Sequence, residues 1–239
     1  MHSEVRRPRP HDWVSVGAAL ASLFAVGALV AGNRTAAAAG AAVAAGATLA
    51  ARSASGRHPG PMPYALRWVL YAPRWPLTAA RLRRILEPKA GERILEVGPG
   101  VGIYSLPIAA AITPGGRLDA LDVQRDMLGV LERRARKANV GNIVPIEGDA
   151  QRLPYPDGCF DAAYLIGVLG EVPDPSAALA ELRRVLRPGG RLVVGEALVV
   201  DPDGVRLAPL CESARRASFG LERRLGSRFA YFARFRVAA

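Results

Sequence analysis

The chain has 239 residues, half of them hydrophobic, and its 32 basic against 21 acidic residues give a net charge of +11. This length fits one domain of ordinary size with a further segment. The apolar content excludes a disordered chain, and two cysteines, Cys159 and Cys211, are too few for a disulfide scaffold or a thiolate metal site. All three histidines lie in the first 58 residues. We therefore expect no metal site and no histidine base in the remaining chain.

Two uncharged runs follow the N-terminus, over residues 13–31 and 35–51, and the second is rich in alanine and glycine. About 20 apolar residues cross a bilayer, so the first run predicts a transmembrane helix. Small residues in the second run would let two such helices pack closely. We therefore predict a membrane anchor over residues 1–58. A cleaved signal peptide is the alternative, although the first run is longer than the usual hydrophobic region of such a peptide.

The arginines around these runs predict the orientation of the anchor. Three arginines precede the first run and two follow the second, whereas the turn between the runs carries Arg34 alone. Because positively charged flanks favour the cytoplasmic side, we expect both ends of the anchor in the cytoplasm. The folded domain that follows is then cytoplasmic as well.

Beyond the anchor, short β-type runs alternate with helical ones. Strands are predicted over residues 93–97, 117–121, 142–146, 160–166 and 191–196, and helices over residues 103–112, 126–139 and 176–186. This alternation implies a parallel sheet covered on both faces. Two final runs, 219–225 and 228–237, predict an antiparallel hairpin. The predicted fold over residues 76–239 is α/β, a Rossmann-like doubly wound sheet of seven strands that is mostly parallel.

A glycine-rich turn, Gly98-Pro99-Gly100-Val101-Gly102, follows the first predicted strand. Glycines let a backbone pass close to a ligand, and the next helix directs its N-terminal N–H groups toward it. The spacing G-x-G-x-G differs from the dinucleotide pattern G-x-G-x-x-G, and the chain has no P-loop pattern. Asp122 ends the second strand, where a carboxylate can accept both hydroxyls of a ribose. Asp149 follows the third strand, where it can accept from an adenine amino group.

The segments ILEVGPGVG, LDVQRDML, EGDAQRLPYPDGCFDAAYLI and ELRRVLRPGGRLVVGE resemble the successive motifs of class I S-adenosylmethionine-dependent methyltransferases. The likeness covers about residues 76–237 and is strongest to the methyltransferase type 11 branch, which includes quinone-biosynthesis enzymes. It implies S-adenosyl-L-methionine as the cofactor and a small-molecule acceptor. The sequence departs from the quinone relatives at Gly170 and Glu171, where those often carry histidine or asparagine.

The resemblance also implies which residues surround the methionine part of the cofactor. Glu96 would hold its amino group, usually through water. Gly98, Gly100 and Gly102 would form the wall around the methionine part.

The nucleoside part would meet four further residues by the same resemblance. Asp122 would bind the ribose hydroxyls, and Met127 would pack near the adenine. Asp149 and Ala150 would meet the adenine edge. Two of these positions have structural alternatives: Met127 is equally consistent with helix packing, and Asp149 with a turn carboxylate that binds local N–H groups.

Methyl transfer from a sulfonium is an in-line displacement, so alignment of donor and acceptor supplies much of the acceleration. A base is needed only if the acceptor must lose a proton. Glu171, just past the fourth predicted strand, is our candidate catalytic residue, either facing the substrate or acting as a base. Its alternative role is a solvated carboxylate at the start of the next helix. Tyr164 alternates within a strand and is expected in the core.

Residues 59–75 form the predicted link between anchor and domain, and aromatic side chains alternate with arginines from residue 64 to 86. This composition is typical of a segment resting on an anionic headgroup layer. In the resembled family, the same region forms a cap over the cofactor. A second group of arginines spans residues 215–236, and we explain both groups first by a membrane surface. Nucleic acid is not expected as a partner because no nucleic-acid-binding motif accompanies the arginines.

Together, these features predict a membrane-anchored methyltransferase with a cytoplasmic catalytic domain and a small, lipophilic acceptor. An anchor raises the local concentration of enzyme where such an acceptor resides. Two alternatives stay open: a methyltransferase for a soluble metabolite, and a non-catalytic protein that binds S-adenosylmethionine as a scaffold.

Overall fold

The computed structural model describes residues 60–71, 76–198, 201 and 203–237, together with four isolated positions near residue 40. The predicted spans over residues 13–31 and 35–51 therefore lie almost entirely outside the described residues. Among the helices that are described, none is long and apolar enough to cross a membrane. The anchor and the proposed boundaries at residues 58 and 75 stay predictions.

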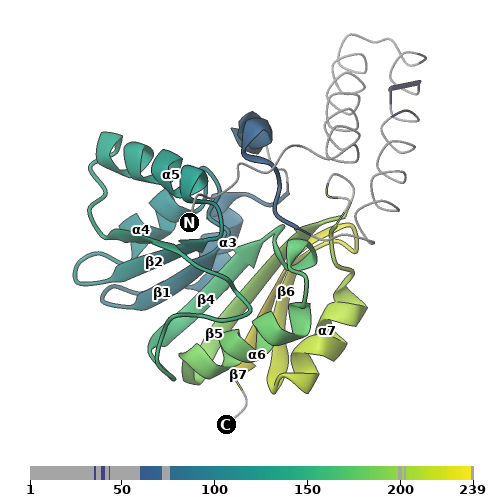
Figure 1. Ribbon diagram of the computed structural model, residues 1–239. Helices are drawn as coiled ribbons and strands as arrows, with labels where there is room; N and C mark the ends of the chain where they lie inside the picture. Colours follow the sequence, from purple (N-terminus) through teal and green to yellow (C-terminus); the bar gives the residue numbers. More distant parts are fainter. Residues whose placement is uncertain are drawn as a thin grey trace.

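Seven strands form one sheet in the order β3-β2-β1-β4-β5-β7-β6 (Figure 1). Their bounds are β1 Arg93–Val97, β2 Arg117–Asp122, β3 Ile143–Glu147, β4 Phe160–Ile166, β5 Leu186–Ala197, β6 Phe219–Gly226 and β7 Ala230–Val237. The first five strands are parallel, and β7 lies antiparallel between β5 and β6. The predicted seven-stranded, mostly parallel sheet with a C-terminal antiparallel hairpin is confirmed.

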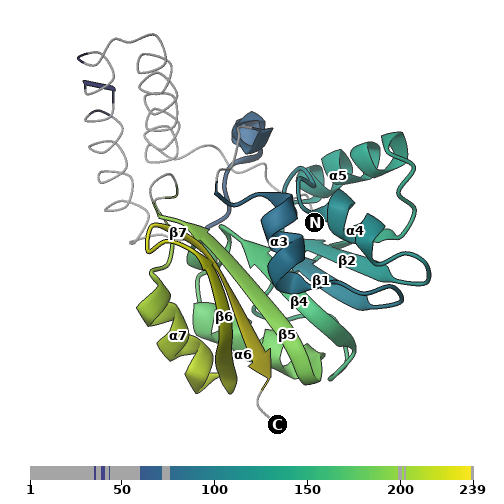
Figure 2. The ribbon, with the colours of Figure 1, turned by 180° about the vertical axis from the view of Figure 1, so that it is seen from behind.

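Helices cover both faces of this sheet (Figures 1 and 2). Their bounds are η1 Tyr64–Tyr71, α3 Ala79–Leu86, α4 Ser105–Ala111, α5 Arg125–Lys137, η2 Leu169–Glu171, α6 Pro175–Val185 and α7 Leu207–Arg216. Alternate strand residues point to opposite faces. Ile94 of β1 packs in one cluster with α3 and α4, whereas Leu95 and Val97 pack in another with α6 and α7. The period-two pattern of each strand thus builds two cores.

Most element boundaries differ from the sequence prediction by one or two residues, and two of the differences have clear local reasons. Helix α4 begins at Ser105, two residues later than predicted, because Gly102 has a positive φ of +79° and ends the preceding turn. Strand β5 begins at Leu186 instead of Arg191, because Leu186 already pairs with Phe160 of β4 across an irregularity in register.

Five of the arginines of residues 215–236 form ion pairs within the domain. Arg234 is 5% exposed, donates to the Ile85 carbonyl at 2.8 Å and pairs with Glu87 and Glu222 at 2.8 and 2.9 Å. Other arginines of the group make similar pairs: Arg215 and Arg216 with Glu212, Arg223 with Glu87, and Arg236 with Glu222. The contacts of Arg223 and Arg234 tie the β6–β7 edge to the end of α3, so the five paired arginines have a structural use that needs no membrane.

Gly195 in β5 leaves no space for a side chain, because a Cβ there would lie 2.8 Å from Ile166 Cδ1 and from the Phe232 ring. Overpacking of a dense core costs about 1–3 kcal/mol. We expect Gly195→Ala to lower the free energy of unfolding by about this amount in urea titrations. Gly141→Ala is the matched control, since a Cβ at Gly141 meets nothing within 4 Å. Equal stability of the two variants would contradict the predicted packing.

Candidate functional site

A cavity of about 430 Å³ lies at the carboxyl edge of the sheet, between the turns that follow β1, β2, β3 and β4. β1 and β4 are neighbours, but the chain leaves β1 toward α4 on one face and β4 toward α6 on the other. Such a switch point in strand order is where open α/β sheets bind ligands. The volume is that of a small-molecule site. The N-terminal segment contributes Met62 and Leu70 to the lining.

The glycine-rich turn forms one wall because its backbone adopts conformations that favour glycine. Gly98 and Gly100 have φ values of +68° and +53°. A Cβ on Gly98 would overlap Val168 after β4, and one on Gly100 would lie 2.8 Å from Leu70 Cδ1. The turn therefore presents bare backbone to the cavity.

Gly102 and Glu96, both predicted to bind the cofactor, are not among the lining residues. Gly102 instead lets the turn pack on the side chains of Leu131 and Leu106. Glu96 is 2% exposed and lies at the end of β1, where burial raises its pKa to about 7. The hydroxyl groups of Ser105 and Tyr164 oppose this rise in pKa.

Three buried oxygens near Glu96 complete no hydrogen bond of ordinary geometry: Glu96 Oε2, the Ser105 hydroxyl and the Tyr164 hydroxyl. Buried polar atoms of this kind normally find a protein, water or ligand partner. Tyr164 is fully buried, as predicted for a core residue.

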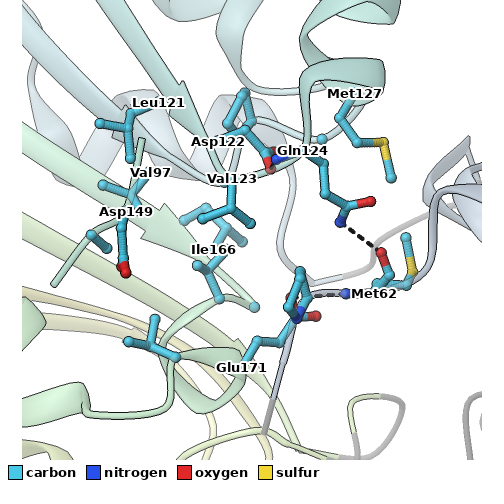
Figure 3. A pocket seen from close by; sticks show the side chains of 18 of the residues that line it. Met62, Val97, Leu121, Asp122, Val123, Gln124, Met127, Asp149, Ile166 and Glu171 are labelled. Atoms are coloured by element: carbon cyan, nitrogen blue, oxygen red, sulfur yellow. Dashed lines mark hydrogen bonds between the residues drawn. The ribbon is translucent and has the colours of Figure 1, made fainter. Parts of the chain in front are cut away.

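Asp122 and Met127 line the cavity from the β2 side (Figure 3). The Asp122 carboxylate accepts the Gln124 N–H at 2.9 Å. Burial raises the pKa of Asp122 to about 6, although the N–H groups of Gln124 and Gly100 lower it. Met127 is 2% exposed and packs against Val101, so it belongs to the core as well as to the lining.

Asp149 and Ala150 line the cavity beyond β3. Ala150 is buried, whereas Asp149 is exposed and accepts the backbone N–H of Gln151 at 2.9 Å and its side-chain amide at 2.9 and 3.0 Å. Asp149 therefore forms the turn that was the structural alternative to adenine binding, and it also lies at the cavity; the adenine contact stays a prediction.

Glu171 lies in η2 and reaches the cavity from the β4 side (Figure 3). Burial raises its pKa well above the usual range, and the charges of Asp201 and Asp203 raise it further. The Met62 N–H, which donates to Glu171 Oε2 at 3.2 Å, lowers it. Together these influences favour the neutral carboxyl.

Met62 holds the N-terminal segment over the cavity through two hydrogen bonds (Figure 3). Its N–H donates to Glu171, and its carbonyl accepts from the Gln124 side chain at 2.8 Å. Farther along, Arg134 of α5 lies over the Tyr71 ring, 5.4 Å from its centroid. Sequence reasoning did not single out Met62, Leu70 or Gln124 as individual residues. Gln124 lies inside the segment LDVQRDML and Leu70 inside the region that caps the cofactor in the resembled family, whereas the hydrogen-bond partners of Met62 are distant in the chain.

The buried carboxyl of Glu96 makes stability depend on pH. Its pKa is about 7 when folded against 4.5 unfolded, so the folded state binds a proton more tightly. The stabilisation is complete below pH 4.5 and is lost as the pH rises through 7. At 1.36 kcal/mol per pKa unit this amounts to about 3 kcal/mol.

We therefore expect the free energy of unfolding to fall less between pH 5 and pH 8 in Glu96→Gln than in the unmodified protein, as measured by urea titration. Glu132→Gln, on the exposed side of α5, is the control and should leave the pH dependence unchanged. Parallel curves for Glu96→Gln and the unmodified protein would contradict the assignment.

Residues 95–194 match the methyltransferase domain family. An uncharacterized 37.1 kDa protein in transposon TN4556 of Streptomyces fradiae is 43% identical over 111 residues, which are 46% of this chain and 32% of that protein. A demethylmenaquinone methyltransferase of Geobacillus kaustophilus is 36% identical over 110 residues, 46% of this chain and 47% of that enzyme. The matches thus span between a third and a half of these relatives' length.

Solved structures share the fold. A SAM-dependent methyltransferase from Aquifex aeolicus superposes with a TM-score of 0.68 at 19% identity, over 75% of this chain and 100% of that chain. The [4+2]-cyclase SpnF superposes with a TM-score of 0.61 at 22% identity, over 67% of this chain and 80% of that chain. At these identities the likeness concerns the fold. Residues 95–194 thus match a methyltransferase domain, and the described fold is the one that these solved structures share.

Proposed function

We propose that this protein transfers a methyl group from S-adenosylmethionine to a small, lipophilic acceptor. The observation that carries the proposal is a largely apolar cavity at the β1/β4 switch point, with a bare glycine turn on one side and Glu171 on the other. When bound, the cofactor supplies a methyl group on a positively charged sulfur.

The residues of this chain fit that cofactor. The turn at Gly98 and Gly100 offers backbone where any Cβ would collide with Val168 or Leu70. Glu96 carries an unpaired buried oxygen under the same turn, a suitable partner for an amino group through a bridging water. We assign the wall around the methionine part to Gly98 and Gly100, and a packing role to Gly102.

The nucleoside part would lie along the β2 and β3 turns. Asp122 is placed to accept hydroxyl donors, and its carboxylate is already oriented by the Gln124 N–H. Met127 and Ala150 supply apolar contact for the adenine, and Asp149 supplies an acceptor at its edge.

The acceptor is proposed to be lipophilic because the remaining lining is apolar. Ile166, Val168 and Val172 line the β4 side. Met62 and Leu70 belong to the N-terminal segment over the cavity, residues 60–71, which we call the cover. The name of the Geobacillus relative, a demethylmenaquinone methyltransferase, supports an acceptor of this character. Glu171 is the group best placed to face the acceptor or to take a proton from it.

Contact with a membrane is a further part of the proposal. On η1, Leu70 faces the cavity, while Trp68 and Tyr71 are 50% and 53% exposed. Aromatic side chains of this kind, together with Arg67, suit a headgroup layer. With an anchor over residues 1–58, the catalytic domain would work at the cytoplasmic face, where a lipophilic acceptor is concentrated.

Asp122→Asn is expected to weaken S-adenosylmethionine binding about 10- to 100-fold in isothermal titration calorimetry. The reason is the loss of charge-assisted hydrogen bonds, worth about 1.5–3 kcal/mol. Asp126→Asn, exposed in the first turn of α5, is the matched control and should bind as the unmodified protein does. Unchanged affinity in Asp122→Asn would remove Asp122 from the proposed site.

Methyl-labelled S-adenosylmethionine incubated with the full chain and a membrane extract tests the function itself. We expect label in the lipid fraction, and several-fold less label when the Asp122→Asn protein is used at a cofactor concentration below its dissociation constant. Label in the aqueous fraction alone would indicate a soluble acceptor. Label in neither fraction, with cofactor binding intact, would favour a non-catalytic scaffold.

A further inference from the structure

The exposed apolar side chains of the domain gather at the carboxyl edge of the sheet. Among the described residues from 60 onward, five large apolar side chains are about half exposed, and four of them stand at this edge: Trp68, Tyr71, Val123 and Phe229. Scattered exposed apolar residues need no explanation, whereas exposed apolar surface gathered in one place indicates an interaction site. We propose that these residues and the arginines beside them, the docking edge, rest on an anionic lipid surface through two patches.

The inference rests on the proposed function, which already includes a membrane contact of η1. It adds a second contact on the far side of the cavity and a preference for anionic lipid. Together the two contacts decide which edge of the domain faces the bilayer.

The first patch consists of η1 and the turn after β2. Trp68 and Tyr71 are exposed on η1, and Val123 follows the last residue of β2. Arginines stand beside these side chains: Arg67 precedes Trp68, and the Arg134 guanidinium lies 5.4 Å from the centroid of the Tyr71 ring. Aromatic rings with arginine beside them are suited to the boundary between headgroups and acyl chains.

The second patch is the turn between β6 and β7, with Arg228 and Phe229. Phe229 is 50% exposed, and the Arg228 guanidinium lies 4.7 Å from the centroid of its ring. The Phe229 carbonyl accepts the Leu198 N–H at 2.7 Å, and the next residue, Ala230, pairs with Ala197 at the end of β5. Because β5 runs parallel to β4 and β1, this turn lies at the carboxyl edge.

Two arginines near this turn are not used in ion pairs within the described domain. Arg224 and Arg228 are exposed, and neither forms an ion pair with the described residues, unlike the other five arginines between residues 215 and 236. Both stand close to Gly226 and Ser227, where the hairpin turns. Their charges are therefore available to an anionic headgroup.

The two patches lie on either side of the cavity. In the strand order β3-β2-β1-β4-β5-β7-β6, the turn after β2 and the β6–β7 turn flank β1 and β4, whose ends border the cavity. Figures 1 and 2 show η1 and the β6–β7 turn at the same end of the sheet. A lipid surface that touches both patches therefore also runs past the cavity.

The charges of this edge are divided between the patches and the cavity. No arginine stands among the described residues that line the cavity. Asp122 and Glu171 line the cavity, whereas three other carboxylates each accept a backbone N–H of their own turn: Asp149, Asp174 and Asp201. Near Val123, the exposed Asp126 stands next to the exposed Arg125. The positive charge that the patches present thus comes from the arginines beside exposed rings.

The chain that precedes the first patch points to lipid as the occupant. The continuously described chain begins at Gly60, and the next two residues, Pro61 and Met62, line the cavity. The uncharged run that we propose to lie in the membrane ends at Ala51, nine residues earlier. Nine extended residues span at most about 30 Å. A bilayer that holds this run is therefore within about that distance of the carboxyl edge.

Anionic lipid matches the composition of the patches better than neutral lipid does. Guanidinium groups bind phosphate and carboxylate groups, and the cytoplasmic leaflet carries anionic headgroups. The rings of Trp68 and Phe229 suit the interface of any bilayer. Neutral lipid would accommodate these rings but leave the charges of Arg224 and Arg228 unbalanced.

Quenching of a single tryptophan by doxyl-labelled lipid tests the second patch in the full chain. Phe229→Trp and Leu221→Trp are each made in a chain whose own tryptophans are replaced through Trp13→Phe, Trp68→Phe and Trp75→Phe. Leu221 is the matched control, because it is 48% exposed on the same hairpin but nearer its other end. With vesicles of phosphatidylcholine and phosphatidylglycerol, Phe229→Trp should be quenched at least threefold more strongly than Leu221→Trp. A tether alone would leave the two probes equally accessible.

The dependence on charge tests the choice of lipid. In vesicles of phosphatidylcholine alone, or at about 1 M salt where the Debye length is about 3 Å, quenching of Phe229→Trp should fall at least twofold. Arg228→Gln, added to the Phe229→Trp chain, should have the same effect. Arg84→Gln is the control and should change nothing, because Arg84 is exposed on α3 near Leu86, whose carbonyl accepts from Arg191 at the opposite edge. Thermal unfolding checks that every variant folds.

Equal quenching of the two probes, or quenching that ignores lipid charge and Arg228→Gln, would overturn the proposal. Shielding of Phe229→Trp from aqueous iodide without quenching by lipid would also overturn it, and would assign the edge to a protein partner or to a second copy of the chain.

Failure of the docking edge and failure of the methyl-transfer function are distinguishable, because the quenching experiment uses no cofactor. Lipid contact without S-adenosylmethionine binding would sink the function and keep the docking edge. Cofactor binding and lipid labelling without preferential quenching of Phe229→Trp would keep the function and sink the docking edge.

Discussion

The close approach of the turn after β1 to the turn after β4 is the constraint on which this site depends. Gly98 adopts a positive φ, and a Cβ there would overlap Val168, so the two turns meet through bare backbone. The meeting point separates the cavity into two parts. The turns after β1, β2 and β3, with Asp122, form the part that we propose for the nucleoside, and the turn after β4, with Glu171, forms the part that we propose for the acceptor. The place of each turn in the sheet, more than any single side chain, therefore decides which part of the cavity the turn forms.

The ionisable residues that line the cavity differ in sign from the net charge of the chain. The net charge is +11, yet the ionisable side chains among the described lining residues are acids and one tyrosine. Arginines are used elsewhere: Arg93 and Arg117 pair with the buried Asp119, and Arg234 joins β7 to α3. Because these partners hold basic side chains away from the carboxyl edge, the cavity keeps an acidic character. Such a cavity favours a cationic sulfonium ligand and disfavours anionic acceptors.

Much of the fold was predictable because it depends on local patterns. The alternation of strand and helix runs indicated the parallel sheet, and the glycine-rich turn after β1 indicated its ligand edge. Long-range contacts were not predictable, since the Met62–Glu171 hydrogen bond joins residues 109 positions apart. A sequence pattern does not predict the burial of a polar residue either. Glu196 follows an apolar run, as an exposed residue at a strand end would, yet it is fully buried. Glu96 and Gly102 occupy motif positions but lie outside the cavity lining. The spacing of a motif does not distinguish residues that contact a ligand from residues that support the turn.

The Glu171 carboxyl lines the proposed acceptor site and also binds the cover. The Met62 N–H donates to Glu171 Oε2, and the Met62 carbonyl accepts from Gln124 beside Asp122. One residue of the cover is therefore fixed to the acceptor part and to the nucleoside part at once. A donor that enters the acceptor part competes with Met62 for the same carboxyl, whereas the Gln124 bond is untouched. Each of these two hydrogen bonds is worth about 1 kcal/mol net. The cover is therefore tied to both sides of the cavity by hydrogen bonds of similar strength, and neither bond alone fixes its position.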